Sequence, residues 1–164
     1  MFKTLADFDT KFKEWSLLTD KERAFFFGDE YLPLPRNHAN RISIIKDSLA
    51  LKFTKIALDK VPTYSINSDA NFKNEMTINL DEVWGKEQKI QDVRNWLFER
   101  GIPFSRTIYL LYSDIVVKTD WKTLVNYWDA FGDSVGVEML AIDSTKSWLC
   151  SFHHENVITF YSYY

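Results

Sequence analysis

Apolar residues recur at helical spacing through much of the first hundred residues. A first stripe, at steps of three and four positions, predicts a helix at the start of the chain and consists of Phe2, Leu5, Phe8, Phe12 and Trp15. A second stripe predicts a long helix that ends near Lys60 and consists of Ile42, Ile45, Leu49, Phe53 and Ile56. A third predicts a helix over Glu82–Arg100, which Gly101 and Pro103 terminate.

The segments between these stripes are shorter and more polar. Thr19 and Glu22 have the spacing of a capping box, which predicts the start of a short helix that runs through Phe27. Residues 64–66 and 76–80 are candidate short strands, with a polar loop between them.

After residue 105 the pattern changes to that of strands. Strands are predicted over Thr107–Tyr112 and Ile115–Lys118, and a helix that Thr119 and Asp120 cap follows and stops at Gly132. Three further strands are predicted over Val137–Ile142, Trp148–His153 and Val157–Tyr163. The connections between them are short enough to join only antiparallel neighbours.

These elements together predict an α+β fold. N-terminal helices, over about residues 1–101, precede a mostly antiparallel sheet with an inserted helix and a C-terminal meander, over about residues 105–164. The length of 164 residues suits a single domain. The aromatic C-terminal strand is a candidate sheet edge, open to pairing with a second copy of the chain.

Composition narrows the class of protein. Aromatic residues make up 16% of the chain, which argues against intrinsic disorder. The net charge of −3 weighs against direct binding of nucleic acid. The charge is uneven, because residues 120–164 hold two basic and six acidic side chains. Two interpretations stay open for these carboxylates: solvation of a sheet, or an acidic face for a basic partner.

The compartment follows from cysteine use and hydropathy. Cys150 is the only cysteine, which excludes an intramolecular disulfide and suits a reducing cytosol. Its apolar neighbours predict a buried, unreactive thiol. The first thirteen residues are charged rather than signal-like, and no apolar run is long enough for a membrane span, so a cytoplasmic location is predicted.

The sequence His153-His154-Glu155 suggests chemistry more strongly than any other cluster. Imidazoles and a carboxylate are zinc ligands, which makes a metal-dependent hydrolase an alternative function. Adjacent residues of a strand point to opposite faces, however, so His153 and His154 would not bind one metal ion if both lie in a strand. A polar hairpin turn is therefore favoured, and we expect no catalytic residues, no metal and no cofactor.

A resemblance covers about residues 106–160. An aspartate-tryptophan helix start at Asp120-Trp121, the run Tyr127-Trp128-Asp129 and the His-His-Glu hairpin occur in the order found in small bacterial proteins encoded beside polymorphic toxins, including contact-dependent growth inhibition systems. The chain thus resembles their immunity proteins. Ala130 departs from the pattern, where many relatives have an acidic residue. The resemblance implies a protein that blocks a toxin domain, often a nuclease with a basic cleft, without catalysis.

We therefore predict an immunity protein that binds a cognate toxin domain through the acidic, aromatic C-terminal third. The residues expected at the partner are the acidic Asp129, Asp133, Glu138, Asp143 and Glu155, with Trp148 and Tyr163 as aromatic anchors. A general protein-interaction module is a further alternative, because it needs the same kind of surface.

Overall fold

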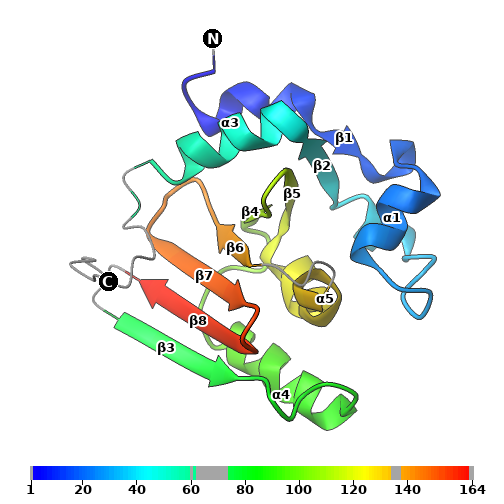
Figure 1. Cartoon of the computed structure of the whole chain (residues 1–164), viewed down its shortest axis with the longest axis vertical. Helices are drawn as coiled ribbons and strands as arrows, with labels where there is room; N and C mark the ends of the chain where they lie inside the picture. The colour runs from blue at the N-terminus through cyan, green and yellow to red at the C-terminus, as the bar shows by residue number, and fades with distance from the viewer. Residues whose placement is uncertain (1, 60, 62–73, 134–137, 163–164) are drawn as a thin grey trace.

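The computed structural model describes residues 2–59, 61, 74–133 and 138–162. Its centre is an eight-stranded sheet of order β1-β2-β5-β4-β6-β7-β8-β3, in which all neighbouring strands are antiparallel (Figure 1). The strands are β1 Lys13–Glu14, β2 Ser43–Lys46, β3 Asn74–Asn79, β4 Thr107–Leu111, β5 Ile115–Asp120, β6 Met139–Ile142, β7 Trp148–His153 and β8 Val157–Ser162.

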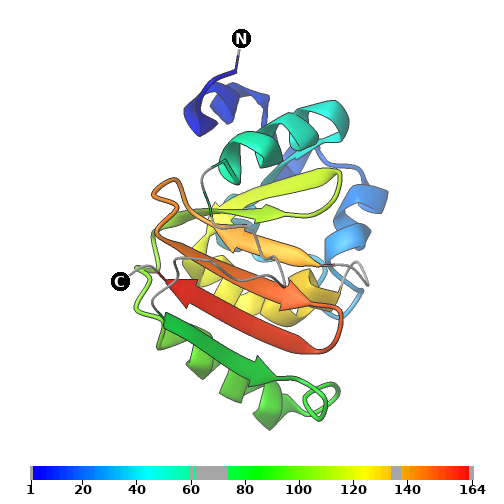
Figure 2. The same cartoon turned by 60° about the vertical axis from the view of Figure 1, so that its left-hand side comes forward.

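Helices cover both faces of this sheet (Figure 2). The helices are the 3₁₀ segments η1 Leu5–Lys11 and η2 Trp15–Leu17 and the α-helices α1 Asp20–Phe26, α2 Arg36–Ala39, α3 Asp47–Ala57, α4 Glu87–Phe98 and α5 Trp121–Asp133. The expected α+β class is confirmed. None of the helices in the described ranges is both long and apolar enough to cross a bilayer.

Alternation along the strands divides the interior into two cores. In β4, Leu110 faces one core while Tyr109 and Leu111 face the other, as the pleat of a strand requires. The first core lies against α5 and α4, where Trp121 of α5 packs edge-to-face on Trp148 of β7 with ring centroids 5.4 Å apart.

The second core lies against η1 and α3. Phe53 of α3 is fully buried between Phe8 of η1 and Tyr109, with centroid distances of 5.2 and 4.8 Å. The first core includes Val93 and Leu97 of α4, so each face of the sheet buries the apolar side of at least one long helix.

The helix predicted from Ile42 is wrong in its first turn. Residues Ser43–Lys46 form β2, and α3 begins only at Asp47. Ile44 and Ile45 are both buried but belong to opposite cores, which a strand allows and one face of a helix does not. The stripe from Phe2 to Trp15 is also only partly helical, because β1 interrupts it to pair with β2.

Most other elements match their predictions, with shifted boundaries. The capping box forms, since Thr19 Oγ1 accepts from the backbone N–H of Glu22 at 3.2 Å. The helix predicted over Glu82–Arg100 begins later, at Glu87, because a turn that includes Gly85 at φ +75° precedes it. Asp120 belongs to β5, yet its Oδ1 accepts from the backbone N–H of Thr123 and so caps α5.

The C-terminal strand is not an edge, contrary to the sequence-based expectation. β8 lies between β7 and β3, and β3 is the outermost strand on that side. Three of the eight strands, β1, β2 and β3, come from the first hundred residues; β3 corresponds to the candidate strand predicted at residues 76–80, whereas β1 and β2 lie in segments predicted to be helical. The strand predicted at residues 64–66 lies outside the described residues.

Candidate functional site

Two of the predicted partner-binding carboxylates are interior groups. Asp129 is buried in α5, where it accepts a hydrogen bond from the hydroxyl of Tyr31. Asp143 is buried in the β6–β7 turn and accepts from Thr145, at 2.9 Å from the backbone nitrogen and 2.5 Å from Oγ1. Neither side chain presents much surface to a partner.

Asp120 is a third buried carboxylate of the same region. Its Oδ2 lies 2.7 Å from Nη1 of Arg41, which balances its charge. Three of the six acidic side chains after residue 119 are therefore buried, and the negative charge of this segment does not translate directly into an acidic surface.

Trp148 is a core residue rather than an exposed anchor. Its side chain is 4% exposed and lies between Trp121 and Phe160, on which it stacks with centroids 5.7 Å apart. Of the remaining predicted residues, Asp133 is the last residue of α5 and Tyr163 lies outside the described residues.

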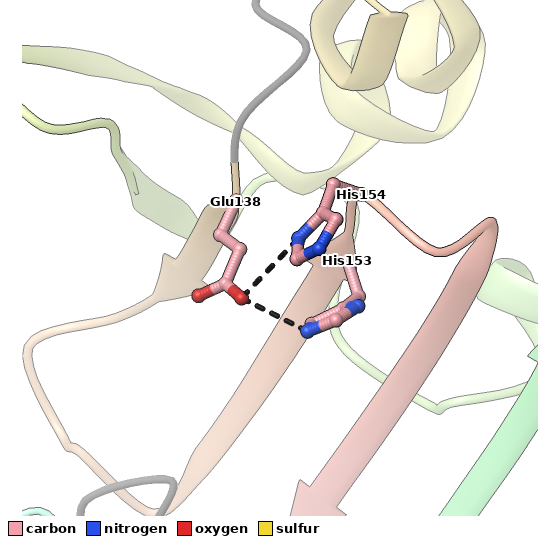
Figure 3. A group of neighbouring side chains, drawn as sticks. All are labelled: Glu138, His153 and His154. Carbon is pink, nitrogen blue, oxygen red and sulfur yellow. Dashed lines mark ion pairs between the residues drawn. The ribbon is translucent and has the colours of Figure 1, made fainter.

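Glu138 and the two adjacent histidines converge at one end of the sheet (Figure 3). Oε1 of Glu138 lies 2.9 Å from Nε2 of His153 and 3.6 Å from Nδ1 of His154. Met139 pairs with Phe152, so one further step of the same register places Glu138 opposite His153. The β6–β7 hairpin therefore builds this contact.

The two imidazoles lie side by side, because the condition under which alternation would separate them, that both residues lie in a strand, is not met. His153 is the last residue of β7, but His154 lies in the following turn, where the alternation of a strand no longer holds. The rings stack with centroids 4.3 Å apart and an interplanar angle of 28°. Both rings thus direct a nitrogen towards the same carboxylate oxygen.

Glu155 lies on the other side of the His153 ring. Its backbone N–H donates to Nδ1 of His153 at 3.2 Å, and its Oε2 lies 3.8 Å from the same nitrogen. This hydrogen bond assigns the proton of the neutral ring to Nε2, which faces Glu138. Glu138, rather than the predicted Glu155, is therefore the carboxylate at which the two imidazoles meet.

The β7–β8 turn also contacts the turn that precedes α4. Asn156 Oδ1 accepts from the indole nitrogen of Trp84 at 3.0 Å, and its carbonyl accepts from the backbone N–H of Leu80 at 2.7 Å. Trp84 is 39% exposed, and its neighbours Asp81 and Glu82 are exposed as well. Five exposed side chains at this end of the sheet together form what we call the sheet-end surface: Asp81, Glu82, Trp84, Glu138 and Glu155.

Sequence reasoning missed both contacts. Glu138 was expected as a charge at a partner, and its pairing with His153 was not predicted, although the short β6–β7 hairpin fixes a register that contains this pair. Nothing in the local pattern indicates that Trp84 lies beside Asn156, because 72 residues separate them along the chain.

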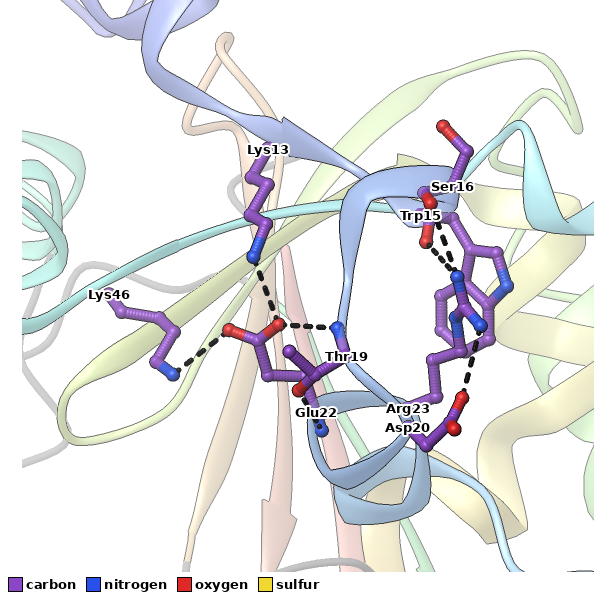
Figure 4. Close-up of polar contacts among 8 residues, drawn as sticks. All are labelled: Lys13, Trp15, Ser16, Thr19, Asp20, Glu22, Arg23 and Lys46. Carbon is purple, nitrogen blue, oxygen red and sulfur yellow. Dashed lines mark hydrogen bonds and ion pairs between the residues drawn. The ribbon is translucent and has the colours of Figure 1, made fainter.

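A second polar cluster, at Glu22, joins elements of the N-terminal half (Figure 4). The Glu22 carboxylate accepts from the backbone N–H of Thr19 at 2.8 Å and lies 3.1 Å from Nζ of Lys13 and 3.2 Å from Nζ of Lys46. These contacts, the Thr19 N–H first, lower the pKa of Glu22 to about 2. The cluster ties α1 to β1 and β2, which is a structural role.

Cys150 is buried in β7, as predicted from its apolar neighbours. Burial raises the pKa of the thiol well above its usual range, which suppresses the thiolate that a nucleophile requires.

Comparison with protein-family models, with curated proteins and with solved structures found no match to this chain.

Proposed function

We propose that this chain is an immunity protein that binds and neutralises a cognate bacterial toxin domain in the cytoplasm. Its partner is a nuclease domain with a basic surface, from a contact-dependent growth inhibition system or one of similar type. The sheet-end surface is the observation that carries the proposal, since four exposed carboxylates and the partly exposed indole of Trp84 lie at the same end of the sheet, on turns and strand ends. Inhibition by contact requires neither catalysis nor a cofactor.

The chemistry of this surface suits a basic partner. Carboxylates at an interface accelerate encounter with a positively charged protein, and a partly exposed tryptophan supplies apolar area that slows dissociation. Lys86 is a cation beside this surface, with Nζ 4.0 Å from Oε2 of Glu82, and the surface itself contains four carboxylates. Of the residues predicted from sequence, Glu138 and Glu155 belong to it.

Co-production with the toxin domain encoded immediately upstream tests the proposal. We expect the two proteins to copurify and growth to be restored in cells that make both. Equal inhibition of growth with and without this protein would refute the proposal. Copurification with unrelated proteins but not with the toxin would instead indicate a general interaction module.

Charge reversal tests whether the carboxylates of the sheet-end surface accelerate association with the toxin. The double variant Glu82→Lys, Glu155→Lys is expected to slow association with the toxin by about 10-fold at low ionic strength, with a smaller effect at high salt. Glu14→Lys is the matched control, because Glu14 is an exposed carboxylate of β1, the strand at the opposite edge of the sheet. Association kinetics, measured in the presence of EDTA, give the association rate with the toxin for the double variant and for the control. An equal effect of the control would contradict the assignment of the surface.

A further inference from the structure

We propose that Glu138, His153 and His154 bind one divalent ion of a first-row transition metal, with Zn²⁺ as the test ion. The three donor atoms are a carboxylate oxygen and two imidazole nitrogens, and they all lie within 4.8 Å of one another. They come from the residue that precedes β6, the last residue of β7 and the first position of the following turn. The proposal concerns binding alone and includes no reaction.

The spacing of the donors fits a single small ion. Zinc binds imidazole nitrogen and carboxylate oxygen at roughly 2.0–2.2 Å, so two ligands of a tetrahedral site lie about 3.3 Å apart. The two distances from Oε1 of Glu138, 2.9 Å to His153 and 3.6 Å to His154, fall on either side of this value. A distance of 3.6 Å is too long for a hydrogen bond, but it is close to the separation of two metal ligands.

The donor set and its exposure favour an open site. Two imidazoles and a carboxylate are a set that zinc accepts when a fourth position is left to water. The side chains of Glu138 and His154 are 49% and 54% exposed, whereas that of His153 is 18% exposed. The cluster therefore has one ligand anchored in the sheet and two that can adjust by a few tenths of an ångström around an incoming ion.

Glu155 is placed to support His153 from behind. When Nε2 ligates the metal, the single proton of the neutral ring moves to Nδ1, which then requires an acceptor. Oε2 of Glu155 lies 3.8 Å from Nδ1 and is the carboxylate available on that side. A carboxylate that accepts from the second nitrogen of a ligating histidine fixes the ring and raises its basicity. Metal binding thus replaces the hydrogen bond from the backbone N–H of Glu155 with one to its side chain.

Binding of the ion would affect the sheet-end surface without depending on the proposed function. Glu138 belongs to both, and an ion of charge +2 reduces the negative charge that a basic partner meets. Metal binding is measured on the isolated protein, while association with the toxin is measured in EDTA. A failure of one proposal is therefore distinguishable from a failure of the other.

Titration calorimetry of the full chain, first stripped with EDTA and then titrated with ZnCl₂, tests the site. We expect saturable binding of one ion per chain and a rise in Tm with Zn²⁺. Co²⁺ should bind competitively and give the visible absorption of a four- or five-coordinate ion with nitrogen and oxygen ligands. Absence of saturable binding, or several equivalent weak sites, would overturn the proposal.

Variants assign the ligands. Loss of a residue that hydrogen-bonds to a metal ligand typically costs about 10–100-fold in metal affinity, so Glu155→Gln should weaken binding by about 10-fold. Loss of a ligand itself should weaken binding by more than about 100-fold. Glu138→Gln and His154→Ala remove ligands at exposed positions, and their Tm in EDTA reports whether the fold is intact. If Glu138→Gln binds Zn²⁺ as tightly as the unaltered chain, the ion is held adventitiously by the histidines and the three-ligand site is refuted.

His38→Asn is the matched control. It removes the third histidine of the chain, whose Nδ1 lies 2.5 Å from the hydroxyl of Tyr127 and which is outside the cluster. Its affinity for Zn²⁺ should equal that of the unaltered chain. A loss in this variant comparable to that in His154→Ala would place the binding elsewhere and overturn the assignment.

Discussion

Glu22 stabilises the N-terminal half through several contacts of one carboxylate. The group completes a capping box at the start of α1 and lies between two lysines that come from different strands. A carboxylate that accepts a backbone N–H and faces two cations is stabilised in its charged form, which is why its pKa falls to about 2. The contribution of Glu22 to folding therefore depends on its charge as well as its shape.

The variant Glu22→Gln keeps a side chain that can complete the capping box but removes the attraction to both lysines. We expect the free energy of unfolding to fall by about 1 kcal/mol near neutral pH. The pKa of the folded state is below the usual 4.5, so the stabilisation is present above that value and is lost as the pH falls towards 2.

Urea unfolding across this pH range gives the difference between variant and unaltered chain, which should shrink on acidification. Glu87→Gln is the control, because the Glu87 side chain is 82% exposed and pairs with Arg94 at 3.5 Å. A difference that stays constant with pH would contradict the charge-based explanation.

At the scale of elements, Lys146 connects the β6–β7 turn to the end of α3. Its Nζ donates to the backbone carbonyls of Ile56 at 2.7 Å and Asp59 at 3.0 Å. A cation at the C-terminus of a helix donates to carbonyls that lack intrahelical partners and interacts favourably with the negative end of the helix dipole. The turn thereby fixes α3 against its face of the sheet.

Lys146→Met should lower the free energy of unfolding by about 1–2 kcal/mol, since it removes charge-assisted hydrogen bonds but keeps the aliphatic stem. Thermal or chemical denaturation measures the change. Lys52→Met is the control, because Lys52 is an exposed residue of α3. Equal losses in the two variants would show that the contact has no specific role.

The elements that could be predicted from the sequence are those that local chemistry specifies. Thr19 and Glu22 cap a helix from three positions apart, and the strands after residue 105 have continuous β-forming runs. The start of α3 was mispredicted because Ile42 and Ile45 fit a helical stripe, while Ile44 between them fits only a strand. Residues 43–46 form a strand rather than a helix because they pair with β5. The sequence pattern of this segment alone does not contain that information.

The candidate site could be predicted only in part for the same reason. His153 and His154 stand out in the sequence, but the carboxylate that meets them is Glu138, fifteen residues earlier. Asp129, Asp143 and Trp148 are of the acidic and aromatic types expected at this interface, and they are nevertheless buried. Burial depends on how α5 and the β6–β7 turn pack on the sheet, so residue type alone does not identify surface groups.

At the scale of the whole molecule, Cys150 reports on global unfolding. It is fully buried in β7, an interior strand, and packs in the core that includes α5. Its pKa is raised by burial, so both access and ionisation oppose reaction in the folded state.

Modification by a thiol reagent should therefore be at least about 1,000-fold slower in native buffer than in denaturant, because it requires opening of the sheet. With a thiol reagent that releases a chromophore when it reacts, absorbance measures the rate of modification. Ser16→Cys adds an exposed thiol and should give a second, rapid phase. Rapid labelling of the unaltered chain in native buffer would show that β7 opens locally.

The position of β3 determines when the sheet can be completed during synthesis. Residues 74–79 pair only with residues 157–162 in the described structure, so β3 is made more than seventy residues before its neighbour β8 exists. Until β8 emerges from the ribosome, β3 has no strand to join, and contacts this distant in sequence form slowly. If the chain is an immunity protein, protection begins only after translation has passed β8, which would favour synthesising it ahead of, or faster than, the toxin it binds.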